Sequence, residues 1–116
     1  MASKTIVILG GGVGGMIAAN ELRAKLPMEH RIVLIERNAE HAFAPSFLWL
    51  MTGDRKPEQV RRPLKNLLRR GVEFVHADAG AVDFQTRRVI TKGGEFSFDY
   101  LIIALGAELA PELLPG

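Results

Sequence analysis

Three glycines near the start of the chain, Gly10, Gly12 and Gly15, follow the pattern G-x-G-x-x-G. In a turn that binds a diphosphate, the first glycine permits the tight passage from strand to helix. The second lets the main chain approach the phosphates, and the third lets the helix pack closely on the strand. The N–H groups at the start of that helix point at the negative charge. The spacing therefore predicts a phosphate-binding turn, and a tight turn without a ligand is the alternative.

A carboxylate follows at the separation that nucleotide binding requires. Glu36 comes 21 positions after Gly15, where a carboxylate accepts hydrogen bonds from a ribose and repels a 2′-phosphate. A solvated acid at the end of a strand is the alternative for this residue. Arg37 follows with a planar cation, which stacks on adenine, contacts phosphate or lies free in solvent.

The segments on either side of the glycines predict the elements that position them. Residues 5–9 (TIVIL) and 31–36 (RIVLIE) are largely apolar runs, typical of strands buried on both faces of a parallel sheet. Residues 16–26 predict an amphipathic helix that ends before Pro27. Its apolar positions are Ile17, Ala18, Leu22 and Leu26. The first 36 residues therefore predict a β-α-β unit with a right-handed crossover and two parallel, neighbouring strands.

The second half of the chain predicts a short helix and two further strands of the same sheet. The helix begins at Pro63 and is capped by Gly71. Its apolar face consists of Leu64, Leu67 and Leu68. Residues 72–75 and 100–105 predict the two strands, and the second of them reads as buried on both faces.

A small meander and an apolar loop complete the prediction. Residues 81–83, 88–91 and 95–98 are short β-type segments, and a tight turn at 92–94 joins the last two. Residues 42–51 are too apolar for a free loop, so we expect them to pack on the domain. The sequence thus predicts an α/β domain with a parallel sheet and a β-meander on one face.

Composition narrows the class of protein. The chain has 116 residues, 47% of them hydrophobic, and no cysteine, which fits one globular domain and excludes a disulfide scaffold or a cysteine nucleophile. The apolar run before Gly10 is too short for a signal peptide or a membrane span, so a cytoplasmic location is the default. Residues 55–70 carry seven basic side chains and one acid; a solvated helix face is the simpler reading, and a patch for anions, nucleic acid or an anionic membrane is the alternative. The three histidines do not have metal-ligand spacing, and we predict no metal site.

Five motifs occur in order along the chain: residues 10–15 (GGGVGG), 34–37 (LIER), 43–46 (FAPS), 71–75 (GVEFV) and 98–107 (FDYLIIALGA). Together they resemble the N-terminal FAD-binding segment of sulfide:quinone oxidoreductases, with type II NADH dehydrogenases as close relatives, in the pyridine nucleotide-disulfide oxidoreductase superfamily. The resemblance covers essentially the whole chain. It implies a three-layer, Rossmann-type FAD/NAD(P)-binding domain over residues 1–116, truncated where an NAD(P)-type domain is inserted in the family. The chain is then an N-terminal fragment of a flavoprotein with two dinucleotide-binding domains.

The resemblance also implies the cofactor contacts. The turn at 12–14 would hold the FAD pyrophosphate, Glu36 the ribose, and the backbone at 77–79 the adenine. The loop at 45–46 would border the isoalloxazine ring, although a merely packed hydrophobic loop is the alternative. The last strand would approach the pyrophosphate and ribityl chain at 104–106, where the family usually has threonine in place of Leu105. The complete predicted set is Gly10, Gly12, Val13, Gly14, Gly15, Glu36, Arg37, Pro45, Ser46, Ala77, Asp78, Ala104, Leu105 and Gly106.

In the intact family enzymes, FAD takes two electrons from sulfide or NADH and passes them to a quinone. The absence of cysteine excludes the branch that carries a redox-active Cys-x4-Cys after the second strand. Both quinone-reducing branches remain, and the loop at 45–49 favours sulfide as donor. We expect NAD(P)H or quinone to bind only the full-length protein, which is cytoplasmic or peripheral to the membrane. This chain alone is expected to be inactive and without catalytic residues, either empty of FAD or self-associated over its open face.

Two other hypotheses remain at this point. The chain is a stand-alone dinucleotide-binding module without catalysis, or it is a partner-binding or nucleic-acid-binding domain on the same frame. We expect no nucleic-acid partner, because fold analogy and the five motifs favour a flavoprotein.

Overall fold

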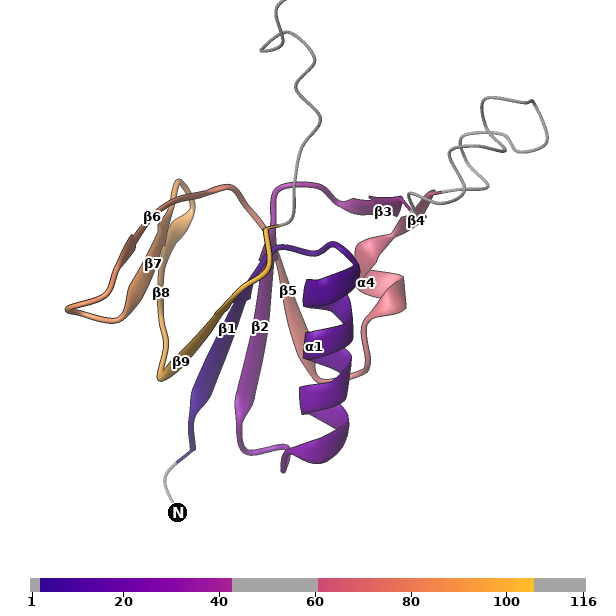
Figure 1. Cartoon of the computed structure of the whole chain (residues 1–116), viewed down its shortest axis with the longest axis horizontal. Helices are drawn as coiled ribbons and strands as arrows, with labels where there is room; N and C mark the ends of the chain where they lie inside the picture. The colour runs from indigo at the N-terminus through magenta and orange to yellow at the C-terminus, as the bar shows by residue number, and fades with distance from the viewer. Residues whose placement is uncertain (1–2, 43–60, 106–116) are drawn as a thin grey trace, which may run out of the picture.

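A four-stranded parallel sheet forms the centre of this computed structural model, which describes residues 3–42 and 61–105 (Figure 1). In spatial order its strands are β5 (Val72–His76), β2 (Arg31–Glu36), β1 (Thr5–Leu9) and β9 (Tyr100–Ile103). Helices α1 (Val13–Lys25) and α4 (Leu64–Leu67) lie on one face. An antiparallel meander lies on the other, made of β6 (Ala79–Asp83), β7 (Arg88–Thr91) and β8 (Gly94–Ser97). The predicted three-layer α/β fold is confirmed.

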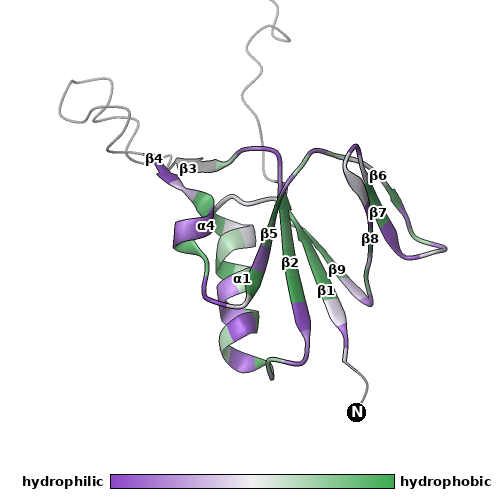
Figure 2. Cartoon of the chain, turned by 180° about the vertical axis from the view of Figure 1, so that it is seen from behind, coloured by the Kyte–Doolittle hydropathy of each residue, from purple (hydrophilic) through white to green (hydrophobic). Residues whose placement is uncertain are grey.

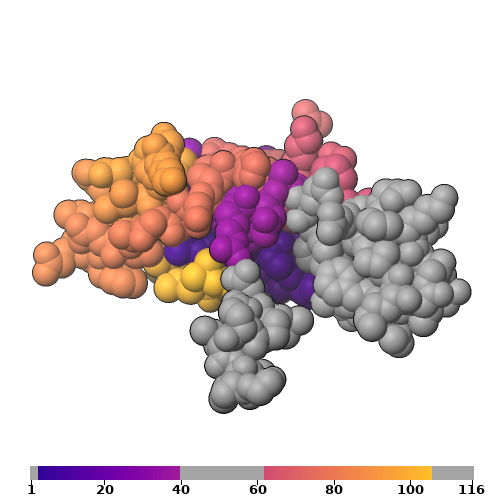
Figure 3. All heavy atoms as spheres, turned by 90° about the horizontal axis from the view of Figure 1, so that it is seen from above, coloured from indigo at the N-terminus to yellow at the C-terminus, as the bar shows by residue number. Residues whose placement is uncertain are grey.

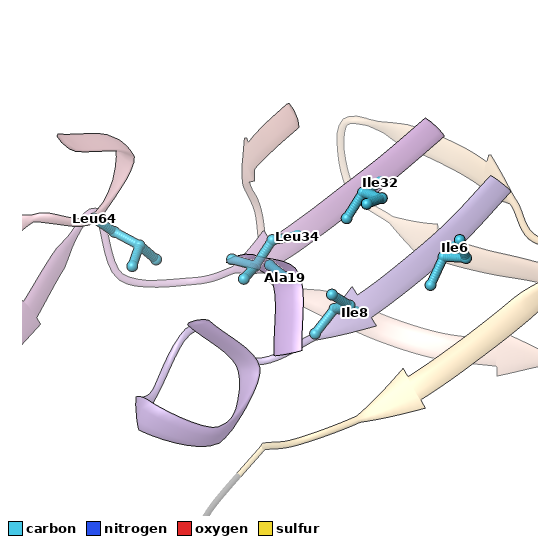
Figure 4. Close-up of a cluster of buried hydrophobic side chains, with 6 residues drawn as sticks. All are labelled: Ile6, Ile8, Ala19, Ile32, Leu34 and Leu64. Atoms are coloured by element: carbon cyan, nitrogen blue, oxygen red, sulfur yellow. The ribbon is translucent and has the colours of Figure 1, made fainter. Parts of the chain in front are cut away.

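The two central strands form because both of their faces are covered. One set of side chains packs under the helices (Figure 4): Ile6, Ile8, Ala19, Ile32, Leu34 and Leu64. The alternate set packs under the meander: Val7, Leu9, Val33, Ile35, Val89 and Phe98. Figure 2 shows the resulting hydrophobic colouring along β1 and β2. Continuous burial explains why these strands read as apolar runs without alternation, and their predicted bounds are confirmed.

The order of the strands creates a switch point beside β1. The first three parallel strands in the chain are β1, β2 and β5, and they build the sheet in one direction. The fourth, β9, returns to the opposite side of β1. Leu9 at the end of β1 therefore pairs with Ile35 of β2 on one side and Ile103 of β9 on the other. Ligands bind open α/β sheets at such a reversal, beyond the carboxyl ends of the strands.

The helix after the glycines differs from the prediction in its start and its buried face. It begins at Val13, directly after the glycines, and its buried positions are Gly15, Ala19 and Arg23. Ile17 is 53% exposed, so its predicted place on the packed face is wrong. The small residues Gly15 and Ala19, four positions apart, lie on one side of the helix and let it approach the sheet closely. Ile17 lies on a different side of the helix, away from the sheet.

The predicted helix around 64–68 is present but shorter. α4 ends at Leu67, and Leu68 is its C-cap, so Gly71 does not cap it. Gly71 instead has a φ of +98° in the turn that leads into β5, where the Val72 N–H donates to the Arg69 carbonyl. The antiparallel pair β3 (Glu40–Ala42) and β4 (Arg61–Pro63) precedes α4 and was not predicted.

The last predicted strand is also shorter and less buried than expected. β9 ends at Ile103, and both Ile103 and Tyr100 are more than half exposed. The two inner residues of β9, Leu101 and Ile102, are only partly buried, so the expected full burial of this strand is wrong. Among the described residues β9 is also an edge strand, paired with β1 alone. The meander is confirmed, with Thr91 pairing with Gly94 across its tight turn. Most of the apolar loop predicted at 42–51 lies outside the described residues.

Candidate functional site

The glycine turn combines two closely packed positions with one open position. Gly10 has a φ of +106°, and a Cβ there would meet the Ala104 carbonyl oxygen. A Cβ at Gly15 would meet the Gly10 carbonyl oxygen. A Cβ at Gly12, by contrast, would meet no atom of the described chain within 4 Å. Gly10 and Gly15 are therefore required by the fold, whereas Gly12 keeps a space clear.

The start of α1 faces outward at the same turn. Gly12 is its N-cap, none of the described side chains bonds to the cap, and the first turn contains no acid. The regular ladder begins where the Met16 N–H donates to the Gly12 carbonyl at 2.9 Å. The first N–H groups of a helix have no partner within the helix and carry partial positive charge. This turn can therefore donate hydrogen bonds to an anion.

The Glu36 carboxylate is held by two backbone amides. The Gly11 N–H donates to Oε1 at 2.9 Å and the Asn38 N–H donates to Oε2 at 2.8 Å. An ionised carboxylate has about four acceptor sites, so each oxygen keeps capacity for a further donor. A fixed carboxylate with acceptor sites on both oxygens matches the two hydroxyls of a ribose diol.

A cavity of about 660 Å³ lies at this end of the sheet. Figure 3, seen from above, shows the chain after β2, the link from β5 to β6 and the end of β9 meeting there. Its volume is in the range of small-molecule sites. It is lined by Leu9, Gly10, Ile35, Glu36, Arg37, Asn38, Ala77, Asp78, Ala79, Gly80, Ala81, Val82 and Leu105. Acid, base and amide side chains thus line a hollow that begins at Gly10 and extends toward the meander.

Hydrogen bonds fix the walls of this cavity. The Ala77 N–H donates to the Glu36 carbonyl at 3.0 Å, which continues the sheet past the end of β5. His76 Nε2 lies 2.9 Å from the Arg37 carbonyl oxygen, and its ring stacks on Phe74 with centroids 6.3 Å apart. These contacts hold the chain after β2 against the chain after β5 and so fix the relative position of two walls of the cavity.

The structure brings most of the predicted contact residues together. Six of them line the cavity: Gly10, Glu36, Arg37, Ala77, Asp78 and Leu105. Gly12, Val13 and Gly14 form the open helix start beside it. Ala104 lies between the cavity and the helix start. Its N–H donates to the Leu9 carbonyl at 2.7 Å, and a Cβ added at Gly14 would lie 4.0 Å from the Ala104 Cβ. Pro45, Ser46 and Gly106 lie outside the described residues.

Sequence reasoning missed the two residues that orient Glu36. Gly11 was available as a signal, because it extends the glycine run at 10–12. Asn38 had no signal, because its backbone N–H makes the contact and any residue except proline has that group. The cavity wall at 80–82 was likewise missed, since Ala81 and Val82 were predicted only as part of the meander and Gly80 had no predicted role. Among the described residues, no group of His, Asp and Glu is arranged to hold a metal ion.

Comparison with known proteins decides the family. The model for "Pyridine nucleotide-disulphide oxidoreductase" matches residues 4–116. The chain belongs to this family. The sulfide-quinone reductase of Aquifex aeolicus (strain VF5) is 38% identical over 109 residues, which are 92% of this chain and 25% of that protein. A type II NADH:quinone oxidoreductase of Staphylococcus aureus is 30% identical over 105 residues, or 89% of this chain and 26% of that protein.

Solved structures agree with this assignment. The crystal structure of the Aquifex aeolicus sulfide:quinone oxidoreductase superposes with a TM-score of 0.82 and 34% identity, covering 93% of this chain and 25% of that one. The water-forming NADH oxidase of Lactobacillus brevis, at 17% identity and a TM-score of 0.79, covers 98% of this chain and 27% of that one and shows the same fold. The predicted resemblance and fold class are confirmed, while the chain spans about a quarter of the length of these relatives. Within the described residues, no helix has the length and apolar character needed to cross a membrane.

Proposed function

We propose that this chain is an FAD-binding segment of a quinone-reducing flavoenzyme, in which residues 1–116 belong to a single domain of a longer protein. The observation that carries the proposal is that two features lie close together. Gly12, at the start of α1, has open space in front of it among the described residues, and both oxygens of the Glu36 carboxylate are held by backbone N–H groups. Members of the family are flavoproteins, which supports FAD as the ligand.

The described residues fit the diphosphate and adenosine parts of FAD. The space in front of Gly12 admits a phosphate against the main chain, where the N–H groups at the start of α1 donate to it. Glu36 accepts from the ribose hydroxyls, and the cavity between Arg37 and Asp78 receives the adenine. Ala104 and Leu105 approach the phosphates and ribityl chain from the other side of β1.

When bound, FAD supplies the two-electron chemistry that carries electrons from a donor to a quinone. The residues of this segment bind and orient the cofactor and exclude water from its adenosine half. None of the described residues in the cavity is assigned an acid–base role. Turnover therefore belongs to the whole protein, with quinone and NAD(P)H contacts on parts beyond this segment.

Sulfide is the donor that the comparisons favour, because the sulfide-quinone reductase relative is 38% identical and the NADH:quinone oxidoreductase relative 30%. NADH is the second candidate, because the relative that is 30% identical is an NADH:quinone oxidoreductase. Quinones are lipid-soluble, so we place the whole enzyme at the surface of the cytoplasmic membrane or in the adjoining cytoplasm.

Titration with ADP, followed by isothermal calorimetry, tests the proposal with a ligand that occupies the described site alone. We expect saturable binding that FAD competes away. Gly12→Ala should weaken ADP binding by about tenfold or more, since its methyl group occupies the diphosphate space. It should leave the melting temperature nearly unchanged, because no atom of the described residues lies within 4 Å of the added group.

Gly93→Ala is the matched control. Its added methyl group lies in the turn between β7 and β8, 4.0 Å from Thr91 Oγ1, the nearest atom among the described residues. Because this position is outside the cavity lining, ADP binding should stay at the wild-type level. Failure of the wild-type chain to bind either ADP or FAD would contradict the proposal. Equal binding by the wild type and Gly12→Ala would do so as well.

A further inference from the structure

Leu64, the first residue of α4, is completely buried behind the site without lining the cavity. Its place is defined by Gly11. A Cβ added to Gly11 would meet Leu64 Cδ2 and would lie 2.9 Å from Glu36 Cγ and 3.0 Å from Glu36 Cβ. Leu64 and the aliphatic part of Glu36 therefore pack on the same side of the Gly11 backbone, whose N–H holds the carboxylate.

Hydrogen bonds hold α4 in place at both of its ends. At its start, the Leu64 N–H donates to the Ala39 carbonyl at 2.8 Å, three residues after Glu36. At its end, Asn20 of α1 donates through Nδ2 to the Leu67 carbonyl at 3.0 Å and accepts from the Arg69 N–H at 2.7 Å. A helix of four residues is not stable by itself. These bonds therefore decide where Leu64 sits.

We propose that Leu64 is a positioning residue for the Glu36 carboxylate, so that recognition of the ribose diol depends on a leucine that does not line the site. This inference rests on the proposed function and adds a residue to it. Leu64 closes the space behind Gly11, and the Glu36 side chain then has one place to lie, with its oxygens on the amides of Gly11 and Asn38. Figure 4 shows Leu64 at the end of the buried cluster farthest from Ile6.

Removing the leucine side chain should affect the diol and spare the diphosphate. With Leu64→Ala the Glu36 side chain gains room to turn from the two amides, and its bond to the ribose 2′-hydroxyl weakens. The start of α1 is untouched, so the diphosphate is held as before. The preference for ADP over 2′-deoxy-ADP is therefore the quantity that reports on Leu64.

Calorimetric titration of three proteins with ADP and 2′-deoxy-ADP tests this. The wild type should prefer ADP about tenfold, the value expected for one hydrogen bond to a charged group. Leu64→Ala should lower this preference to about twofold or less. Binding of 2′-deoxy-ADP, which keeps only the 3′-hydroxyl for Glu36, should weaken less than binding of ADP. Ile32→Val is the control, because Ile32 is completely buried in the same cluster but at the opposite end of β2, and it should keep the wild-type preference.

Amide exchange gives a second readout that needs no ligand. The Gly11 and Asn38 amides should exchange with solvent about tenfold faster in Leu64→Ala than in Ile32→Val at matched stability, because their bonds to Glu36 are loosened. If Leu64→Ala does not fold, Gly11→Ala gives the converse disturbance. Its methyl group displaces Glu36 and lowers the ADP preference, and Leu64→Val in the same chain should restore part of it.

The possible outcomes separate the two proposals. A wild-type preference for ADP that survives in Leu64→Ala, with unchanged Gly11 exchange, overturns the role of Leu64 and leaves the proposed function standing. Absence of ADP binding by the wild type overturns the proposed function, and the amide exchange then decides alone whether Leu64 positions Glu36. An equal loss of preference in Ile32→Val shows general loosening and also overturns the inference.

Discussion

The two ends of the parallel sheet use polar groups in opposite ways. At the amino end, Arg31 Nε donates to both oxygens of Glu73 at 2.9 and 2.8 Å. The Thr5 N–H donates to Asp99 Oδ2 at 2.7 Å, while the Asp99 N–H donates to the Thr5 carbonyl. At the carboxyl end, counting the described residues 3–42 and 61–105 only, Glu36 has acceptor sites left over and Gly12 faces open space.

This difference separates stability from binding within one sheet. Side chains at the amino end find their partners within the chain, and they fasten β1 to β9 and β2 to β5. At the carboxyl end, the fold fixes the position of Glu36 and leaves part of its bonding capacity for a ligand. Substitutions that respect or violate this division should therefore give separable effects on stability and affinity.

Gly15→Ala should have the largest effect and shows that the carboxyl end is not uniformly tolerant. Its Cβ would meet the Gly10 carbonyl oxygen, so α1 must move away from the sheet. We expect a loss of about 3 kcal/mol in the free energy of unfolding, as for overpacking of a tight core position. Urea denaturation measures it, with Gly12→Ala as the neighbouring control. A loss below about 0.5 kcal/mol, the usual scale of surface changes, would contradict the close packing of α1.

Arg23→Met should come next and should affect stability alone. The Arg23 guanidinium is buried and donates to the carbonyls of His30, Leu26 and Pro27 at 2.7, 3.2 and 2.6 Å. Removing it leaves these carbonyls without that donor and should cost about 2 kcal/mol in urea denaturation. The exposed Lys25→Met in the same helix is the control and should cost little. Altered ADP affinity in folded Arg23→Met would contradict the separation of stability at the amino end of the sheet from ligand binding at the carboxyl end.

Glu73→Gln should have a smaller effect. The Arg31–Glu73 pair is about half exposed, so its loss should cost about 0.5 kcal/mol and less in high salt. The hydrogen bond that Arg31 donates to Glu73 raises the pKa of Arg31. A raised pKa in the folded state stabilises at all lower pH and is lost only in strong alkali, so the difference between wild type and variant should be constant from neutral to mildly alkaline pH. A difference that varies across this range would point to another titrating group.

Asp83→Asn should have the smallest effect, in a turn of the meander that belongs to neither end of the sheet. The Thr86 backbone N–H lowers the pKa of the exposed Asp83 carboxyl, with help from the Thr86 side chain and the Gln85 N–H. A lowered pKa stabilises the turn above the ordinary value of 3.8, and this contribution disappears as pH falls through the folded value. The protection factors of the Gln85 and Thr86 amides, taken relative to intrinsic exchange at each pH, should fall in acid in the wild type. In Asp83→Asn they should be lower at neutral pH and independent of pH, because the amide oxygen accepts the same bonds without the charge. Protection that is the same in both proteins at neutral pH would contradict the role of this carboxylate.

The sequence predicts the elements that are buried from both sides much better than those at the margins. β1 and β2 are recovered with their bounds because Ile, Val and Leu fill every interior position. Ile17 misleads because a hydrophobic pattern does not show which stripe of a helix approaches the sheet, and the stripe here is set by small residues. β3 and β4 contain three residues each, which is too short for a pattern to form.

For the candidate site, the sequence predicts residue types and misses geometry. Glu36 and the glycines were found because their chemistry depends on their side chains or on the lack of one. Asn38 was not found because its contribution is a backbone N–H, and Leu64 was read only as part of an apolar face. Contacts between segments far apart in the sequence, such as Asn20 with Leu67, follow from tertiary packing and leave no local pattern.

The pairing of Leu9 with Ile35 has a consequence for how the chain tolerates evolutionary change. The distance from the glycine turn to the carboxylate is measured across two adjacent hydrogen-bonded strands, and the number of residues between them along the chain does not set it. The connection at 26–30 lies at the opposite end of the strands from the glycine turn. Insertions there would increase the spacing between the glycines and Glu36 along the sequence and leave the register between β1 and β2 unchanged. A deletion of one residue inside β2 changes the length of the chain less than such an insertion does. It would nevertheless turn the Glu36 side chain to the opposite face of the sheet.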